Sequence, residues 1–205
     1  MLEAIDLECV RGERRVFSGL SFSLGAGEIL QLFGANGSGK TSLLRIIAGL
    51  VPPASGQVRW RGEPISTLGE DYHQELLYLA HANGIKDDLT AIENLRVAAT
   101  LAGKKIDRAT AFDALERVGL GGREDLPARA LSHGQRRRVA LARTLVSEAS
   151  LWVLDEPLTS LDREAAAEIE AIIESHLARG GAALIATHQE LKMSGATSMR
   201  LQLNG

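Results

Sequence analysis

The segment Gly34-Ala35-Asn36-Gly37-Ser38-Gly39-Lys40-Thr41 decides the fold of this 205-residue chain. It matches the pattern G-x-x-x-x-G-K-[ST], which is typical of loops that bind phosphate groups. Its glycines allow backbone N–H groups to approach phosphate oxygens, because they carry no Cβ. Lys40 is expected to reach the terminal phosphates, and the hydroxyl of Thr41 is suited to binding Mg²⁺.

The residues around this loop have the pattern of a strand followed by a helix. The apolar run 28–33 predicts a strand that enters the loop, and residues 41–48 predict a helix that leaves it. The N-terminus of that helix would face a bound anion. Short apolar runs that alternate with helices predict a mostly parallel, doubly wound sheet, with further strands at 76–79, 151–154, 182–186 and 200–203.

The N-terminal part of the chain predicts strands of a different kind. Residues 3–9 alternate weakly and suggest an edge strand, and residues 16–17 and 20–24 alternate as half-buried strands do. Residues 57–62 alternate in the same way after a group of glycines and prolines. We therefore expect an antiparallel β edge beside the parallel core.

A helical insertion is expected between these strands. Residues from 90 to about 120 have helical spacing, with Asp107 as a cap and Gly119 as a stop, and another helix is expected after 131–135, to about Val146. We predict a single domain over residues 1–205. Its core would cover about 1–85 and 147–205, and its helical subdomain would cover about 86–146.

The composition is that of an ordinary globular protein, with 45% hydrophobic residues and a net charge of −3. That charge argues against nucleic-acid binding driven by charge alone. Cys9 is the single cysteine, so neither an internal disulfide nor a cysteine zinc site is expected. The start of the chain does not resemble a signal peptide, and no apolar run is long enough to span a bilayer. We expect a cytosolic protein that would serve a membrane only through a partner.

Polar residues follow three of the predicted buried strands. The strand ending at Phe33 leads into the glycine-rich loop, and the others lead into Asp155-Glu156 and Thr187-His188. Since the carboxyl ends of parallel strands meet at one edge, we expect these groups to lie together. Asp155 would bind Mg²⁺, Glu156 would act as general base on a water molecule, and His188 would contact the terminal phosphate.

The segment 131–135, Leu-Ser-His-Gly-Gln, predicts a second anion site. Ser132 and the N–H groups after it would open a helix, whose N-terminus attracts negative charge. If one nucleotide uses the first loop, this second site would serve a nucleotide held by another copy of the chain.

With these motifs in order, the chain resembles the ABC ATPase family along nearly its whole length. The resemblance is carried by 34–41, 131–135, 151–157, 160–162 and 186–188. It implies a P-loop NTPase fold with an inserted α-helical lobe, and a head-to-tail dimer around two ATP molecules with Mg²⁺. Each ATP would lie between one copy's phosphate loop and the other copy's Ser132, Gly134 and Gln135. Asp162 would belong to the loop that crosses the dimer seam.

Three positions depart from the family pattern. One is His133, which stands where the motif often has glycine, while Gly134 and Gln135 are kept and function is expected to survive. Arg11 stands where the family has an aromatic residue that stacks on adenine, and a guanidinium plane can also stack on a base. His81 stands where the family usually has a glutamine that contacts Mg²⁺ and the transporter, and histidine can form similar hydrogen bonds.

Residues 58–65 and 80–95 further resemble the ATP-binding subunit of the bacterial cytochrome c maturation system. This implies membrane-integral partner subunits, a peripheral place on the cytoplasmic face of the inner membrane, and haem export or release of a haem-loaded carrier. Two alternatives stay open: the ATPase of another small-substrate ABC transporter, and a soluble ABC-type protein with no transport role.

The remaining conspicuous residues are expected to be structural. We interpret His73 and His176 as surface or helix-face residues, and Cys9 as a small buried apolar residue. Arg136, Arg137 and Arg138 would form a solvated face or pair with acids of the second copy. The two tryptophans, Trp60 and Trp152, would be packing residues.

Overall fold

The computed structural model describes residues 1–203, which divide into two compact units. The first unit consists of Met1–Tyr78, Ala149–Glu156 and the chain from Glu174 onward. The second unit consists of Leu79–Glu148 and Pro157–Ile173.

The first unit contains a five-stranded sheet in the order β6-β7-β8-β3-β9. Strands β7, β8, β3 and β9 pair in parallel, which confirms the predicted parallel core. Every residue of β7 and β8 is buried, as expected for a sheet covered on both faces. The strands span Leu76–Leu79 (β6), Leu151–Asp155 (β7), Ala182–Ala186 (β8), Glu28–Phe33 (β3) and Thr197–Gln202 (β9).

A separate antiparallel sheet of the first unit has the order β2-β1-β4-β5. Because β1 lies between β2 and β4, the expectation of an edge strand at 3–9 is wrong. The alternation is weak because the register of β1 shifts near Asp6 in its pairing with both neighbouring strands. Asp6 itself has a φ of +48°. A bulge of this kind interrupts the period of two. The strands span Leu2–Arg11 (β1), Arg14–Leu24 (β2), Ser55–Trp60 (β4) and Glu63–Pro64 (β5).

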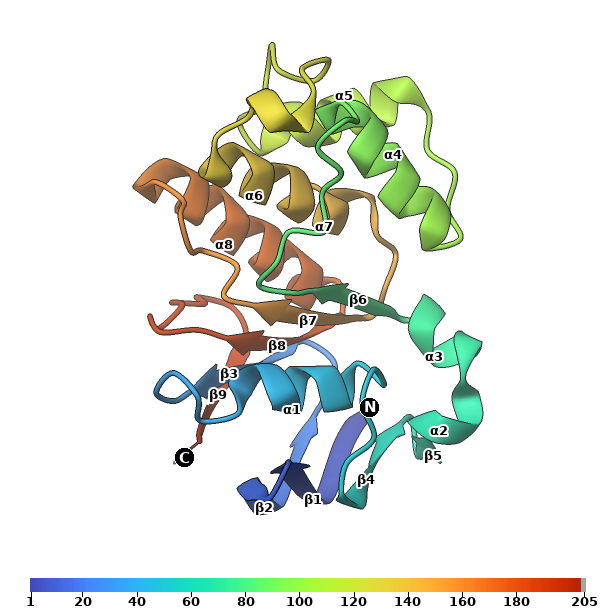
Figure 1. Cartoon of the computed structure of the whole chain (residues 1–205), viewed down its shortest axis with the longest axis vertical. Helices are drawn as coiled ribbons and strands as arrows, with labels where there is room; N and C mark the ends of the chain where they lie inside the picture. Colours follow the sequence, from blue (N-terminus) through green and yellow to red (C-terminus); the bar gives the residue numbers. More distant parts are fainter. Residues whose placement is uncertain (204–205) are drawn as a thin grey trace. The chain divides into compact units, whose positions relative to one another are not determined.

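Helix α1 (Lys40–Ile47) joins the two sheets into one hydrophobic core (Figure 1). Its apolar side chains, Leu43, Leu44, Ile46 and Ile47, are at most 1% exposed. Fully burying such a side chain stabilises the fold by about 1.5–3 kcal/mol. The start of α1, which carries the glycine-rich loop, is therefore held firmly.

Two short helices in the first unit, α2 (Ile65–Leu68) and α3 (Glu70–Gln74), have no counterpart among the predicted elements. They lie between β5 and β6 in the chain. Tyr72 of α3 is buried, and its hydroxyl donates a 2.6 Å hydrogen bond to the carbonyl of Ile47 at the end of α1. Burial raises the pKa of the Tyr72 hydroxyl far above its usual range.

Strand β9 pairs with β3, the strand that leads into the glycine-rich loop. It pairs along the whole length of β3, and the N–H of Leu203 donates to the carbonyl of Phe33 at 2.8 Å. A Cβ on Gly34 would lie 2.8 Å from the carbonyl oxygen of Leu203. The predicted last strand is thus confirmed, and it closely approaches the first residue of the loop.

The second unit is helical (Figure 1). As predicted, Asp107 caps α5, accepting a 2.8 Å bond from the N–H of Thr110, and Gly119, with a φ of +74°, follows its end. The helix expected up to Val146 is interrupted at Ala142 but resumes as α7, which ends at Val146 as predicted. Beside the interruption, the hydroxyl of Thr144 donates to the carbonyl of Leu141 at 2.7 Å and competes with the backbone. The elements are α4 (Ala91–Leu101), α5 (Arg108–Arg117), η1 (Ala128–Ala130), α6 (His133–Leu141), α7 (Arg143–Val146) and most of α8 (Arg163–Ala178).

Of the two interpretations of His176, the surface residue is wrong and the helix-face residue is confirmed. Its side chain is 5% exposed and stacks on Trp152, with ring centroids 3.8 Å apart and planes 6° apart. It follows Ile172 and Ile173 by four and three residues, which puts it on the apolar face of α8. Burial lowers the pKa of His176 to about 4.

Of the two predictions for the three consecutive arginines, the solvated face is wrong, and pairing with acids of a second copy stays a prediction. They do not form a solvated face, because each finds a partner inside the second unit. Arg137 is 3% exposed and donates to the carbonyl of Ala80 at 3.0 Å. Arg136 pairs with Asp87 at 3.0 Å, and Arg138 pairs with an acid described below.

The other predicted structural residues are confirmed. Cys9, Trp60 and Trp152 are buried, and His73 is exposed.

Candidate functional site

The glycine-rich loop connects β3 to α1 and depends on its glycines. Gly37 and Gly39 have φ of +84° and +105°, which residues with a Cβ rarely adopt. A Cβ on Gly39 would lie 2.5 Å from a methyl group of Val16, so this position has no room for a side chain. These glycines therefore allow a backbone course that residues with a side chain would not adopt.

The start of α1 leaves polar groups without partners. Its N-cap is Gly39, and no side chain caps the helix. The Ser38 hydroxyl belongs to a residue that is 3% exposed, and it has no hydrogen-bond partner among the described residues. An uncapped helix N-terminus beside a buried, unpaired hydroxyl fits a bound phosphate group.

Lys40 folds back over the loop. Its ammonium group donates to the carbonyl oxygens of Gly34 at 2.7 Å and Ala35 at 3.4 Å, and the residue is 6% exposed. These acceptors are neutral, so a phosphate oxygen would bind the buried charge more strongly. The side chain is thus held above the loop, where an anion would meet it.

Thr41 and Asp155 meet at the end of the parallel strands. The Thr41 hydroxyl donates a 2.9 Å hydrogen bond to Asp155, which ends β7 and is 2% exposed. Within residues 1–203, no cluster of three or more His, Cys, Asp or Glu side chains could hold a metal ion. A hydroxyl beside one carboxylate still fits Mg²⁺, which commonly takes one or two carboxylates and completes its shell with phosphate oxygens and water.

Glu156 and His188 lie within hydrogen-bond distance of each other at the same edge of the sheet. The Nε2 atom of His188 lies 2.9 Å from a Glu156 carboxylate oxygen. The side chain of His188 is 48% exposed and that of Glu156 is 18% exposed, so the pair is open to water. Glu156 has a φ of +50°, and its N–H donates to the carbonyl of Ala186 at 2.9 Å. A strained backbone at such a place often accompanies function.

The second unit carries the other predicted anion site at the start of α6. Ser132 and Gln135 cap each other: the Ser132 hydroxyl accepts from the N–H of Gln135 at 3.2 Å, and the Gln135 side chain accepts from the N–H of Ser132 at 2.9 Å. A Cβ on Gly134 would lie 2.7 Å from the carbonyl oxygen of Ser160. Gly134 therefore allows the 160–162 loop to lie against α6.

Asp162 holds the 160–162 loop in place, because each of its carboxylate oxygens accepts a hydrogen bond. One accepts a 2.9 Å bond from the N–H of Ala165 and caps α8, and the other pairs with Arg138 of α6. The loop also contains Ser160, whose φ is +66°. The segment 160–162 and the start of α6 thus form one connected structure.

Arg11 and His81, two of the departures from the family pattern, are both exposed. Arg11 is exposed at the end of β1, opposite Arg14 of β2. His81 is exposed in the second unit.

Sequence reasoning missed Val16 and Phe17 of β2 as neighbours of the loop. A Cβ on Gly39 would meet Val16 at 2.5 Å and the ring of Phe17 at 3.2 Å. Both side chains are half-buried. Their alternation indicated a strand, but no signal in the sequence linked that strand to the loop.

No helix within residues 1–203 combines the length and the apolar character that crossing a bilayer requires.

A family model described as ABC transporter matches residues 17–159 of the chain. The Cytochrome c biogenesis ATP-binding export protein CcmA of Nitrosomonas europaea is 57% identical, over 100% of this chain and 96% of that protein. The proteins of the same name from Nitrosospira multiformis and Pseudomonas aeruginosa are 55% and 45% identical, each over 98% of this chain and over 98% and 99% of their own lengths.

Solved structures agree with this result. An ABC transporter ATP-binding protein from Pyrococcus furiosus has a TM-score of 0.85 at 28% identity, covering 98% of this chain and 96% of that one. The ATP-binding cassette MJ0796, a dimer bound to ADP and phosphate, has a TM-score of 0.86 at 20% identity, covering 100% and 97%. At that identity the second likeness shows the fold alone. The chain therefore belongs to the ABC transporter family, as a nucleotide-binding ATPase of the ABC type that is similar over its whole length to the CcmA proteins.

Proposed function

We propose that this chain is the ATP-hydrolysing subunit of an inner-membrane ABC complex for cytochrome c maturation. The observation that carries this proposal is its 45–57% identity, over nearly its full length, to proteins named as cytochrome c biogenesis ATP-binding export proteins. The chain would work at the cytoplasmic face of the membrane, bound to integral membrane subunits. ATP turnover would drive haem export or release of a haem-loaded carrier.

In this proposal the loop 34–41 binds the phosphates of ATP. The uncapped start of α1, the unpaired hydroxyl of Ser38 and the ammonium group of Lys40 support this role. Thr41 and Asp155 would hold Mg²⁺, which would neutralise phosphate charge when bound. Arg11 would stack on the base, with Val16 and Phe17 beside the loop, and His81 stays a predicted contact of the metal.

Glu156 is proposed as the general base. Its carboxylate would take a proton from the attacking water, which needs an acceptor within hydrogen-bond reach. The 2.9 Å pair with His188 supports this assignment, because it orients the carboxylate at the strand end where Asp155 also lies. His188 would then donate to the terminal phosphate and hold it for attack.

We also propose that two copies form a head-to-tail dimer, and that the two compact units of one copy make up a single ABC ATPase domain. The capped start of α6, with Ser132, Gly134 and Gln135, would contact the terminal phosphate held by the other copy. Asp162 would lie at the seam. The attachment of the 160–162 loop to α6 supports a shared role for these two segments.

The Glu156→Gln variant tests the catalytic part of this proposal. We expect turnover to fall by about 100-fold or more while ATP still binds, because the amide cannot accept the proton of water. Steady-state phosphate release and equilibrium nucleotide binding measure the two effects. Glu190→Gln is the control, since Glu190 is exposed in the same unit. Normal turnover of Glu156→Gln would remove Glu156 from this role.

A second experiment tests the biological role. Affinity purification of the intact chain from detergent-solubilised membranes is expected to recover haem-handling membrane subunits. ATP-dependent flux of a small solute into vesicles, without any haem-handling partner, would favour another transporter. A chain that recovers no membrane protein would favour the soluble alternative.

A further inference from the structure

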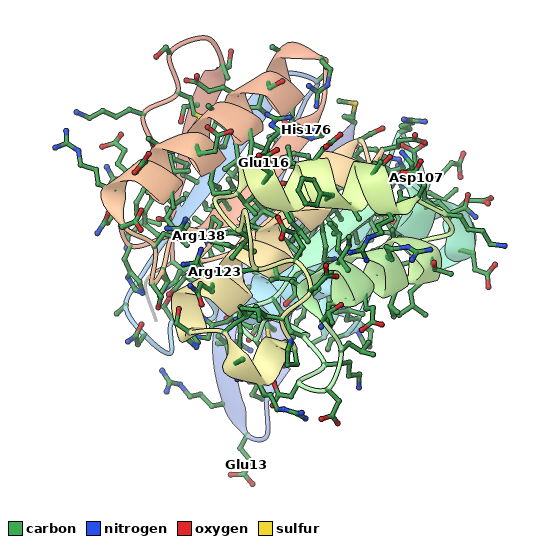
Figure 2. The ribbon with its side chains drawn as sticks, turned by 90° about the horizontal axis from the view of Figure 1, so that it is seen from above. Glu13, Asp107, Glu116, Arg123, Arg138 and His176 are labelled. Carbon is green, nitrogen blue, oxygen red and sulfur yellow. The ribbon has the colours of Figure 1, made fainter. Side chains whose placement is uncertain are left out.

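A cavity of about 430 Å³ opens in the second unit at the start of α6. Its walls include Ser132 and Gly134 of the predicted anion site, and Asp162 of the adjoining loop. Two arginines, Arg123 and Arg138, also line it and are labelled in Figure 2. The family motifs identified in the sequence contain neither arginine.

The two arginines differ in how their charge is used. Arg138 is 20% exposed and pairs with Asp162, and its guanidinium also donates to the carbonyl of Val118 at 3.4 Å. Arg123 is exposed, and among the described residues its side chain has no hydrogen bond or ion pair. The cavity therefore has an excess positive charge, which Arg123 provides, beside the positive end of the α6 dipole.

Arg123 is carried by a turn that is fixed on both sides. Its own N–H donates to the carbonyl of Leu120 at 3.0 Å. The next residue, Glu124, is 5% exposed, accepts the N–H of Gly122 through its side chain at 2.9 Å, and bonds Ile92 of α4 through its carbonyl at 3.0 Å. The side chain thus starts from a rigid backbone, which lowers the entropy lost when it binds a ligand.

Gly119, at the other end of the turn, has no room for a side chain because the Arg138 guanidinium packs against it. A Cβ there would clash with the Arg138 guanidinium and displace it. The Arg138 side chain consequently packs against the turn and, through Asp162, against the 160–162 loop. Arg138 fixes the shape of the cavity, and Arg123 is left to meet an incoming anion.

We propose that Arg123 binds the terminal phosphate of the ATP held on the phosphate loop of a second copy. This inference rests on the proposed head-to-tail dimer. The planar guanidinium of arginine matches the spacing of phosphate oxygens and can bind two of them at once. Since ADP lacks the terminal phosphate, Arg123 stabilises the ATP-bound dimer and contributes nothing to nucleotide binding by a single subunit.

The test compares Arg123→Gln with Arg129→Gln, both made in the Glu156→Gln chain so that ATP is not consumed. Arg129 is an exposed arginine of the same unit that pairs with exposed Asp88 and does not line the cavity. Sedimentation velocity over a range of protein concentrations gives the dimer dissociation constant with ATP and with ADP. Equilibrium binding of ATP at low protein concentration gives the affinity of the single subunit.

We expect Arg123→Gln to weaken the ATP-dependent dimer by at least about tenfold, the effect of losing a charged hydrogen bond. ATP binding by the single subunit should not change, and Arg123→Lys should recover part of the loss. Equal dimerisation of the Arg123→Gln and Arg129→Gln chains would overturn this inference alone. If the Glu156→Gln parent does not dimerise with ATP, the proposed dimer and this inference both fail.

Discussion

The starts of α1 and α6 are both proposed to meet phosphate, yet they are built in opposite ways. Helix α1 begins at a glycine, has no side-chain cap, and leaves the buried hydroxyl of Ser38 unpaired. Helix α6 begins at Ser132, whose side chain and that of Gln135 satisfy each other's backbone N–H groups. The first site is incomplete without a ligand, whereas the second is already a stable helix end.

This difference indicates two kinds of binding. The α1 site contains a buried ammonium group and a buried carboxylate, so a ligand there gains from groups that are already desolvated. The α6 site is partly exposed and holds its positive charge on arginine side chains at the cavity wall. We therefore expect the first site to set nucleotide affinity and the second to set pairing of subunits.

Removing the charge of the first site should have the largest effect. Lys40→Ala is expected to weaken ATP binding by about 100-fold, because a charged hydrogen-bond donor to phosphate is lost. Isothermal titration of the single subunit measures this. The control is Lys192→Ala, an exposed lysine of the same unit. Unchanged affinity in Lys40→Ala would contradict the assignment of the loop.

A methyl group at Gly134 should weaken the pairing of subunits without weakening the binding of ATP. Gly134→Ala places a Cβ 2.7 Å from the carbonyl oxygen of Ser160 and so displaces the 160–162 loop. We expect turnover to fall by about tenfold or more with little change in ATP binding, since a displaced contact acts mainly on the assembled state. Gly121→Ala is the matched control, because its Cβ would meet nothing closer than 3.9 Å. A large loss of ATP binding in Gly134→Ala would contradict the separation.

Acid should weaken the first unit through His176. Burial lowers the pKa of this histidine to about 4, so the folded state prefers the neutral ring. Its contribution to stability is fully present above the unfolded pKa of about 6.5 and is lost as the pH falls toward 4. We expect the free energy of unfolding to drop by about 1–2 kcal/mol from this group between pH 7 and pH 5.

Urea unfolding at the two pH values measures this drop, and His176→Phe serves as the comparison because it keeps a stacked ring but cannot be protonated. The drop should be smaller in that variant by the stated amount. Amide exchange should locate the acid effect in β7 and β8 of the first unit and leave α6 protected. Identical pH dependence in both proteins would remove His176 from this role.

The smallest effect is expected from the cap of α6. Ser132→Ala removes the acceptor of the Gln135 N–H and should cost about 1 kcal/mol of stability. Thermal unfolding monitored by circular dichroism measures the loss. Ser66→Ala, at an exposed position of α2, gives the background effect of a serine substitution. A loss no greater than in Ser66→Ala would show that the cap contributes little.

The parallel sheet could be predicted from the sequence because its strands are short apolar runs with clear boundaries. Strand β6 and strand β8 lie at the predicted residues. The place of β1 could not be predicted, because a bulge at Asp6 disturbs the alternation and strand order depends on distant residues. The break before Arg143 was missed because it comes from the local bond of the Thr144 hydroxyl, which competes with helix hydrogen bonding.

The meeting of Thr41 and Asp155 could be predicted because parallel strands end at one edge. The contacts of the three arginines and the burial of His176 could not. Each depends on which partner approaches in three dimensions, and a charged or titratable residue carries no sign of that partner in its own stretch of sequence. Arg123 went unnoticed for the same reason: only the folded turn brings it to the cavity.

The hydrogen bond from the N–H of Leu203, which follows β9, to the carbonyl of Phe33 connects the last strand to the residue before the phosphate loop. Since the carbonyl oxygen of Leu203 also lies close to Gly34, we expect a movement of the loop on loading with ATP to shift this strand. A spectroscopic label on the exposed face of β9 would therefore report occupancy of the site from outside it, and trimming the strand away would loosen the grip on the phosphates.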